Sequence, residues 1–126
     1  MRAAILILGG GHDQLPAIHE INKLGFLSVV IDKDPGCVSR IYSDIFINVS
    51  TRDPKAIYQA LLIQKLSERI KEVLVIGTDI PHIAIELKTL LGVESQISLD
   101  VARLSIDKFE LKKELQKINV KTPIVI

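Results

Sequence analysis

Three apolar runs in the chain are each followed by a polar turn and then by a helical pattern with a proline in its first turn. Proline suits that turn because its missing N–H would have no partner there. A fourth apolar run, Phe26–Ile31, lies between the first two of these units. Runs that are apolar throughout are typical of parallel strands covered on both faces, and strands alternating with helices indicate βαβ units. We therefore expect an α/β fold: a three-layer sandwich with a parallel sheet of four to five strands. The three runs and their prolines are Ala3–Leu8 with Pro16, Asp44–Val49 with Pro54, and Glu72–Ile76 with Pro81.

Capping residues predict where the helices begin and end. Asp13 is a candidate N-cap for the first helix, and Gly25 fits the position after its end. Asp53 is expected to cap the second helix, which the apolar spacing extends to about Arg69. The third helix is expected to stop at Gly92, and a very short fifth strand could follow near residues 93–97.

Composition excludes several classes of function. The chain has 126 residues, enough for one domain, and only 4% aromatic residues with no Trp, which argues against a base-stacking surface. Sixteen basic and fifteen acidic residues leave no field that would attract nucleic acid or an anionic membrane. Cys37 is the single cysteine, which excludes an internal disulfide and a cysteine zinc cluster. Without a long apolar run or a signal peptide after Met1, we expect a cytoplasmic protein with no nucleic-acid or membrane partner.

The loop after the first apolar run is the first candidate site. Gly9, Gly10 and Gly11 would let a ligand approach the backbone closely, and the helix that follows offers free N–H groups to an anion. His12 lies in the same loop and could contact that ligand. The alternative is a tight turn with nothing bound.

Asp32 ends the second apolar run, 21 residues after Gly11. In a dinucleotide-binding fold an acid near this place bonds a ribose hydroxyl. However, Gln14 stands where that fingerprint needs its third glycine, which weakens a nicotinamide-binding interpretation. Asp32 could equally be a solvated turn residue.

A third candidate loop, Gly77, Thr78 and Asp79, follows the last apolar run. Because loops after parallel strands share one edge of the sheet, we expect it to lie beside the other two around a single crevice. Asp79 could instead be a plain helix cap. The predicted substrate-binding set is Gly9, Gly10, Gly11, His12, Gln14, Asp32, Gly77, Thr78 and Asp79.

Other motifs carry less chemistry. The histidines lack the spacing of a helical metal pair, so we assign no metal. Cys37 lies in a turn with no histidine nearby in sequence, which argues against a nucleophile. Ser50-Thr51-Arg52 could bind an anion, but helix capping would account for the first two residues.

The end of the chain differs from the rest. Residues 1–102 carry 10 basic and 12 acidic side chains, whereas residues 103–126 carry six and three. Asp107–Ile118 has the pattern of an amphipathic helix, and residues 119–126 read as the start of a new strand. We therefore expect a domain spanning 1–102 and, in 103–126, the truncated start of a second region.

The motifs ILILGGGHDQLPAI, VVIDKDP, VLVIGTDIP and LSIDKFELKKELQKINVKTP together resemble the N-terminal part of an ATP-grasp ligase. The resemblance is to the group that contains the carbamoyl phosphate synthetase large subunit, biotin carboxylase and the purine-pathway carboxylases. Its most specific part is the last motif, whose matching residues are Asp107, Lys108, Lys112, Val120, Thr122 and Pro123.

This resemblance implies a Rossmann-like pre-ATP-grasp domain whose first, second and fourth loops border the acceptor-substrate pocket. It places Gly9–Gly11 and Gln14, Asp32, and Gly77–Asp79 on those loops. ATP and magnesium would bind to later parts of a full-length parent, so this fragment itself is expected to carry no cofactor and to be inactive alone. Its expected partners are a small anionic or amino-acid-like substrate and the remainder of the ATP-grasp chain.

Two other functions remain open. One is a Rossmann-type regulatory module that binds NAD or an adenine nucleotide through Asp32. The other is a domain used only for association, with the apolar face of segment 107–118 driving a homodimer.

Overall fold

The structure is a computed structural model that describes residues 2–76, 80–93 and 116. Among these residues, none of the helices has the length and apolar character needed to cross a bilayer. Strands alternate with helices along the chain. In order, the elements are β1 (Ala4–Leu8), α1 (Leu15–Lys23), β2 (Leu27–Ile31), the 3₁₀ helix η1 (Val38–Tyr42), β3 (Ile45–Ile47), α2 (Pro54–Ile63), β4 (Ile70–Val75) and α3 (Pro81–Leu91).

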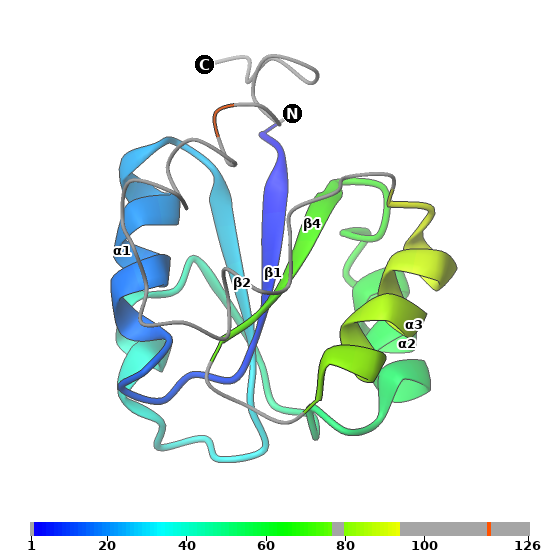
Figure 1. The fold of residues 1–126 in the computed structure, drawn as a ribbon, viewed down its shortest axis with the longest axis horizontal. Helices are drawn as coiled ribbons and strands as arrows, with labels where there is room; N and C mark the ends of the chain where they lie inside the picture. The colour runs from blue at the N-terminus through cyan, green and yellow to red at the C-terminus, as the bar shows by residue number, and fades with distance from the viewer. Residues whose placement is uncertain (1, 77–79, 94–115, 117–126) are drawn as a thin grey trace.

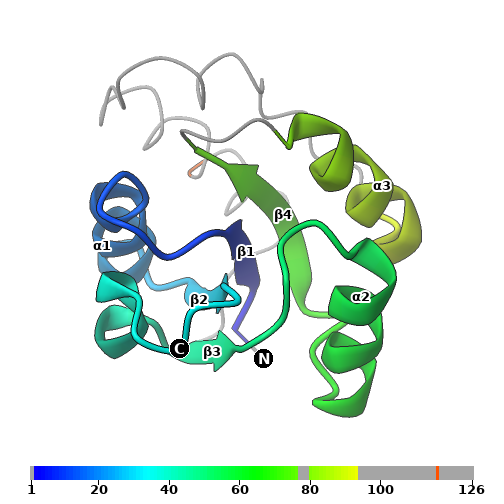
Figure 2. The ribbon, with the colours of Figure 1, turned by 90° about the horizontal axis from the view of Figure 1, so that it is seen from below.

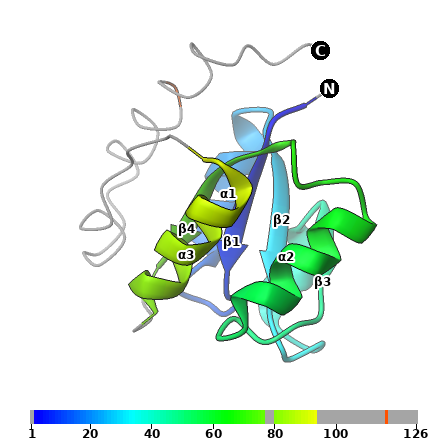
Figure 3. The same ribbon diagram turned by 90° about the vertical axis from the view of Figure 1, so that its right-hand side faces the viewer.

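The four strands form one parallel sheet in the order β3-β2-β1-β4. The helices α1 and η1 cover one face and α2 and α3 cover the other, so the molecule has three layers (Figure 1). Figure 2 looks onto the edge where the strands end, and Figure 3 shows α2 and α3 lying across their face of the sheet. The structure confirms the α/β Rossmann-like sandwich with four parallel strands.

The core lies on both sides of β1, whose five residues are all buried. Ile5 and Ile7 pack with the apolar face of α1, whereas Leu6 and Leu8 pack with α2 and α3. Because alternate residues of a strand point to opposite faces, a strand between two helical layers must be apolar at every position. This requirement explains the unbroken apolar run at the start of the sequence.

Two predicted helix boundaries are wrong. Asp13 does not cap α1: the N-cap position is occupied by Gln14, and no side chain caps the helix there. Helix α2 ends at Ile63 and not near Arg69. Lys65 takes a left-handed conformation, φ 58°, and the Leu66 N–H donates back to the Leu61 carbonyl at 2.8 Å. The chain reverses there because Leu66 is buried, with 3% of its surface exposed.

Other predicted boundaries agree with the structure, except for the cap of α3. Asp53 caps α2 by accepting a hydrogen bond from the Ala56 N–H at 3.1 Å, and Gly25 and Gly92 have the positive φ expected at helix ends. The N-cap of α3 is Ile80, which replaces the suggested Asp79. The possible strand near 93–97, the division at residue 102 and the segment 103–126 lie outside the described residues, apart from Val93 and Gln116.

Candidate functional site

The glycine loop joins β1 to α1 at the carboxyl edge of the sheet. Gly9 has φ +107°, a conformation that favours glycine. The N–H of Gly9 donates to the Ile31 carbonyl at 2.7 Å, that of Gly10 to Asp32 Oδ2 at 2.8 Å, and that of Gly11 to Gln14 Oε1 at 2.7 Å. All three glycine amides thus donate within the protein. A ligand could use these three amides only by displacing an internal hydrogen bond.

Asp32 holds the glycine loop against the turn that follows β2. Its Oδ2 accepts from the Gly10 N–H, and its Oδ1 accepts from the Asp34 N–H at 2.9 Å. The side chain is half-buried and lies at the pocket described below. Its carboxylate therefore organises two backbone turns, while each oxygen keeps some capacity to accept a further bond.

Gln14 connects the glycine loop to the end of β4. Its side chain is 5% exposed, Oε1 accepts from the Gly11 N–H, and Nε2 donates to the Ile76 carbonyl. Ile76 directly precedes the third candidate loop. A single buried amide therefore joins the starting points of two of the predicted site loops.

Gly10 is enclosed by neighbouring side chains. A Cβ placed on it would lie 2.7 Å from Cys37 Sγ and 3.0 Å from Val30 Cγ1. Burial raises the pKa of the Cys37 thiol, and the nearby Asp32 carboxylate raises that pKa further. Because the reactive thiolate is thereby disfavoured, the surroundings favour a packing role for this cysteine.

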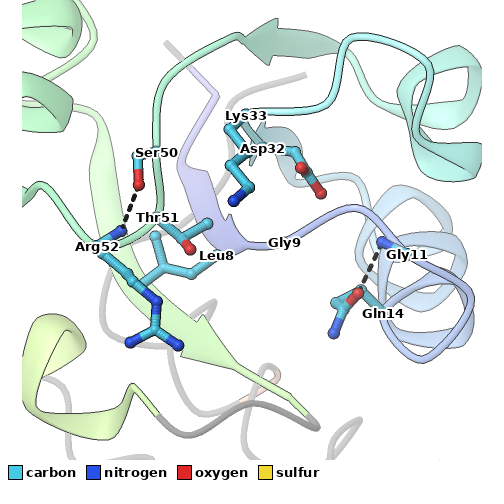
Figure 4. A pocket seen from close by; sticks show the side chains of 9 residues that line it. All are labelled: Leu8, Gly9, Gly11, Gln14, Asp32, Lys33, Ser50, Thr51 and Arg52. Carbon is cyan, nitrogen blue, oxygen red and sulfur yellow. Dashed lines mark hydrogen bonds between the residues drawn. The ribbon is translucent and has the colours of Figure 1, made fainter.

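A pocket of about 280 Å³, with both polar and apolar lining, opens where the loops after β1, β2 and β3 meet (Figure 4). Four of the predicted site residues are on its wall: Gly9, Gly11, Gln14 and Asp32. The remaining wall was not in the predicted site. It consists of Leu8, Lys33, Ser50, Thr51 and Arg52.

The sequence reasoning assigned Ser50 and Thr51 to helix capping, and the structure corrects this. Asp53 is the cap of α2, whereas Ser50 Oγ accepts a hydrogen bond from the Arg52 N–H at 3.2 Å within the turn itself. A usable signal was present in the sequence. The loop after β3 must lie at the same edge as the loops after β1 and β2, because all three strands are parallel.

The remaining predicted residues are placed as follows. His12 is exposed in the glycine loop and does not line the pocket, while Gly10 lies behind it, bonded to Asp32. Gly77, Thr78 and Asp79 lie outside the described residues. Across the described part of the chain, no group of three or more His, Cys, Asp or Glu side chains could hold a metal ion.

Comparison with known sequences finds no match: no family model fits the chain, and no curated protein is similar enough to be detected. Solved structures do match. Phosphoribosylglycinamide synthetase from Anaerococcus prevotii superposes with a TM-score of 0.63 at 16% identity, over 93% of this chain and 29% of that one. N5-carboxyaminoimidazole synthetase from Staphylococcus aureus, complexed with ADP, gives a TM-score of 0.53 at 23% identity, over 73% and 23%.

The matched region is the N-terminal part of these two ATP-grasp synthetases. The fold resembles a pre-ATP-grasp domain. The same architecture also occurs elsewhere: UDP-glucose 4-epimerase from Thermotoga maritima, with UDP-glucose, gives a TM-score of 0.56 at 10% identity, over 96% of this chain and 52% of that one. At such identities the likeness concerns the fold, and the chain spans less than a third of either synthetase.

Proposed function

We propose that this chain is the substrate-binding N-terminal domain of an ATP-grasp carboxylate–amine ligase, similar to carbamoyl phosphate synthetase or biotin carboxylase. The observation that supports it most is the meeting of three strand-end loops around one pocket that carries charged and hydroxyl side chains. The likeness of the fold to the N-terminal parts of two synthetases supports it independently.

In such a ligase, a carboxylate or bicarbonate oxygen attacks the γ-phosphorus of ATP and ADP leaves. An amine then attacks the acyl carbon of the resulting acyl phosphate and displaces phosphate. The part of this domain would be to bind a small anionic or amino-acid-like substrate and to orient it before the reaction, which lowers the entropic part of the barrier. ATP and magnesium would be held by the remainder of the parent chain.

The alternative function, a nucleotide-binding regulatory module, is less well supported by the loop. In a dinucleotide site the pyrophosphate bonds to N–H groups at the start of the helix after the first strand. Here the Gly10 N–H donates to Asp32 and the Gly11 N–H donates to Gln14. Both donors would have to give up internal bonds before they could bind a pyrophosphate.

A direct test is to assay the purified 126-residue chain for magnesium-dependent ATP hydrolysis. We expect no turnover above the buffer blank, and measurable turnover would contradict the proposal. Calorimetric titration with NAD provides the second readout. Micromolar affinity that is lost in Asp32→Ala would favour the regulatory module instead.

A second test of the ligase assignment uses the coding sequence of the gene. If codons follow residue 126, we expect them to encode a lysine-bearing nucleotide lid and a pair of acidic magnesium ligands. A different kind of domain at that position would contradict the ligase assignment.

A further inference from the structure

Two basic side chains flank the pocket, and neither has an acidic partner within residues 2–76 and 80–93. Lys33 follows β2, and Arg52 precedes α2. Among the described residues the ion pairs are Arg2 with Asp44 and Lys88 with Glu72, so neither Lys33 nor Arg52 takes part in one. Two cations at one pocket repel each other, and an anion between them would relieve that repulsion.

The loop before α2 adds two hydroxyl groups, of Ser50 and Thr51, to the same pocket. Ser50 Oγ accepts from the Arg52 N–H, which leaves its own O–H free to donate toward a ligand. Figure 4 shows Thr51 close to Leu8, with Lys33 above this pair and the Arg52 side chain below it. The pocket thus offers an ammonium, a guanidinium and two hydroxyl groups, and Asp32 carries the one carboxylate among the described residues that line it.

We propose that this pocket binds a phosphate group, either as free phosphate or as the phosphomonoester of a small substrate. This inference rests on the proposed function, because it names the anionic group, a phosphate, of the substrate that the domain is proposed to bind. A phosphomonoester brings nearly two negative charges and three strong acceptor oxygens at neutral pH. Those charges match Lys33 and Arg52, and the oxygens exceed the two that a carboxylate could offer to the same donors.

The proposed phosphate site does not lie at the glycine loop, where the glycine motif suggests it. The amides of Gly9–Gly11 are already used, and Asp32 Oδ2 lies against the Gly10 N–H, so a phosphate on the glycine loop would meet a carboxylate. The donors that have no partner among the described residues lie instead in the loops after β2 and β3, on Lys33 and Arg52. The structure therefore assigns phosphate recognition to side chains of the loops after those two strands.

The experiment is an NMR titration of the isotope-labelled chain at constant ionic strength. Three probes are compared: inorganic phosphate, glycerol 3-phosphate and acetate. We expect both phosphates to shift the amides of Lys33, Thr51 and Arg52 in a saturable way and acetate not to do so. Tighter binding of glycerol 3-phosphate would identify a substrate-borne phosphate, and tighter binding of inorganic phosphate would identify free phosphate as the ligand.

Charge-removing variants show whether the binding is specific. Arg52→Gln should weaken phosphate binding about tenfold, the loss of one hydrogen bond to a charged group. Lys23→Gln is the matched control, because it removes one exposed charge at the far end of α1 and should leave the affinity unchanged. Equal weakening in both variants, or shifts confined to Gly9–Gly11, would overturn the proposal.

These outcomes are separate from the fate of the proposed function. A chain that fails to bind phosphate but hydrolyses no ATP and precedes a nucleotide lid would still be a ligase domain. Conversely, saturable phosphate binding in a chain with ATP turnover of its own would retain the pocket and contradict the domain assignment.

Discussion

Gly10 shows how one residue can determine the path of a loop. No side chain fits there, because the space where a Cβ would stand is occupied by Cys37 Sγ and Val30 Cγ1. The absence of a side chain also lets the Gly10 N–H reach Asp32, and the Gly10 carbonyl accepts from the Ser39 N–H at 2.9 Å. The glycine is therefore required for close packing between two turns.

Gly10→Ala should destabilise the fold by about 1–3 kcal/mol through overpacking, measured by urea unfolding. Adding Cys37→Ala should recover part of this loss, since it removes the nearer of the two clashing atoms. Gly36→Ala is the control, because a Cβ there meets its nearest neighbouring atom, Asp34 Oδ1, at 3.4 Å, an ordinary contact. Equal stability of Gly10→Ala and Gly36→Ala would contradict the packing argument.

At the level of the element, the end of α2 is decided by the following chain and not by helix propensity. Lys65 adopts φ 58° so that Leu66 can turn back and bury its side chain. A left-handed conformation costs a residue with a Cβ about 1–2 kcal/mol, whereas glycine adopts it freely.

Lys65→Gly should therefore stabilise the protein by about 0.5–1 kcal/mol, less than the full strain because glycine also gains freedom in the unfolded chain. Gln59→Gly is a control with the opposite expected effect. Glycine at this exposed position inside α2 should lower the free energy of unfolding by about 1 kcal/mol. The two melting temperatures, measured by circular dichroism, should move in opposite directions. A lower melting temperature for Lys65→Gly would contradict the turn geometry.

Across the whole molecule, Gln14 joins parts of the chain that are 62 residues apart. It connects the loop after β1 with the end of β4, across the place where the strand order changes direction. Ligand crevices of open α/β sheets form at this place. A buried amide that satisfies one N–H and one carbonyl there keeps the two loops at a defined separation.

Gln14→Met keeps the approximate volume but leaves the Gly11 N–H and the Ile76 carbonyl without their partner. We expect a loss of about 2 kcal/mol in the free energy of unfolding by urea, the cost of unsatisfied buried polar groups. Gln59→Met, at an exposed position of α2, should change stability by less than about 0.5 kcal/mol. If the two variants proved equally stable, the hydrogen bonds of Gln14 would not be what holds the loop after β1 to the end of β4.

The candidate site could be predicted in part. Gly9–Gly11 and Asp32 were found because each directly follows an apolar run, and the structure brings them together at one edge. Arg52 was considered with Ser50 and Thr51 as a possible anion-binding group but was left out of the predicted site, and Lys33 was not considered, because charged residues in turns are common. Only the placement of the loops after β2 and β3 beside the glycine loop indicates that the two belong to one pocket.

Local patterns in the sequence were sufficient for the α/β class, the four parallel strands and the prolines in the first turns of the helices, because strand and helix periodicities involve neighbouring residues. The strand order, the reversal after α2 and the internal use of the glycine amides depend on residues distant in the chain. Those amides could bind a ligand in an isolated loop, but in the folded protein Ile31, Asp32 and Gln14 accept their hydrogen bonds. Tertiary structure decided which donors remain available, because a buried polar group bonds to whichever partner the fold places beside it.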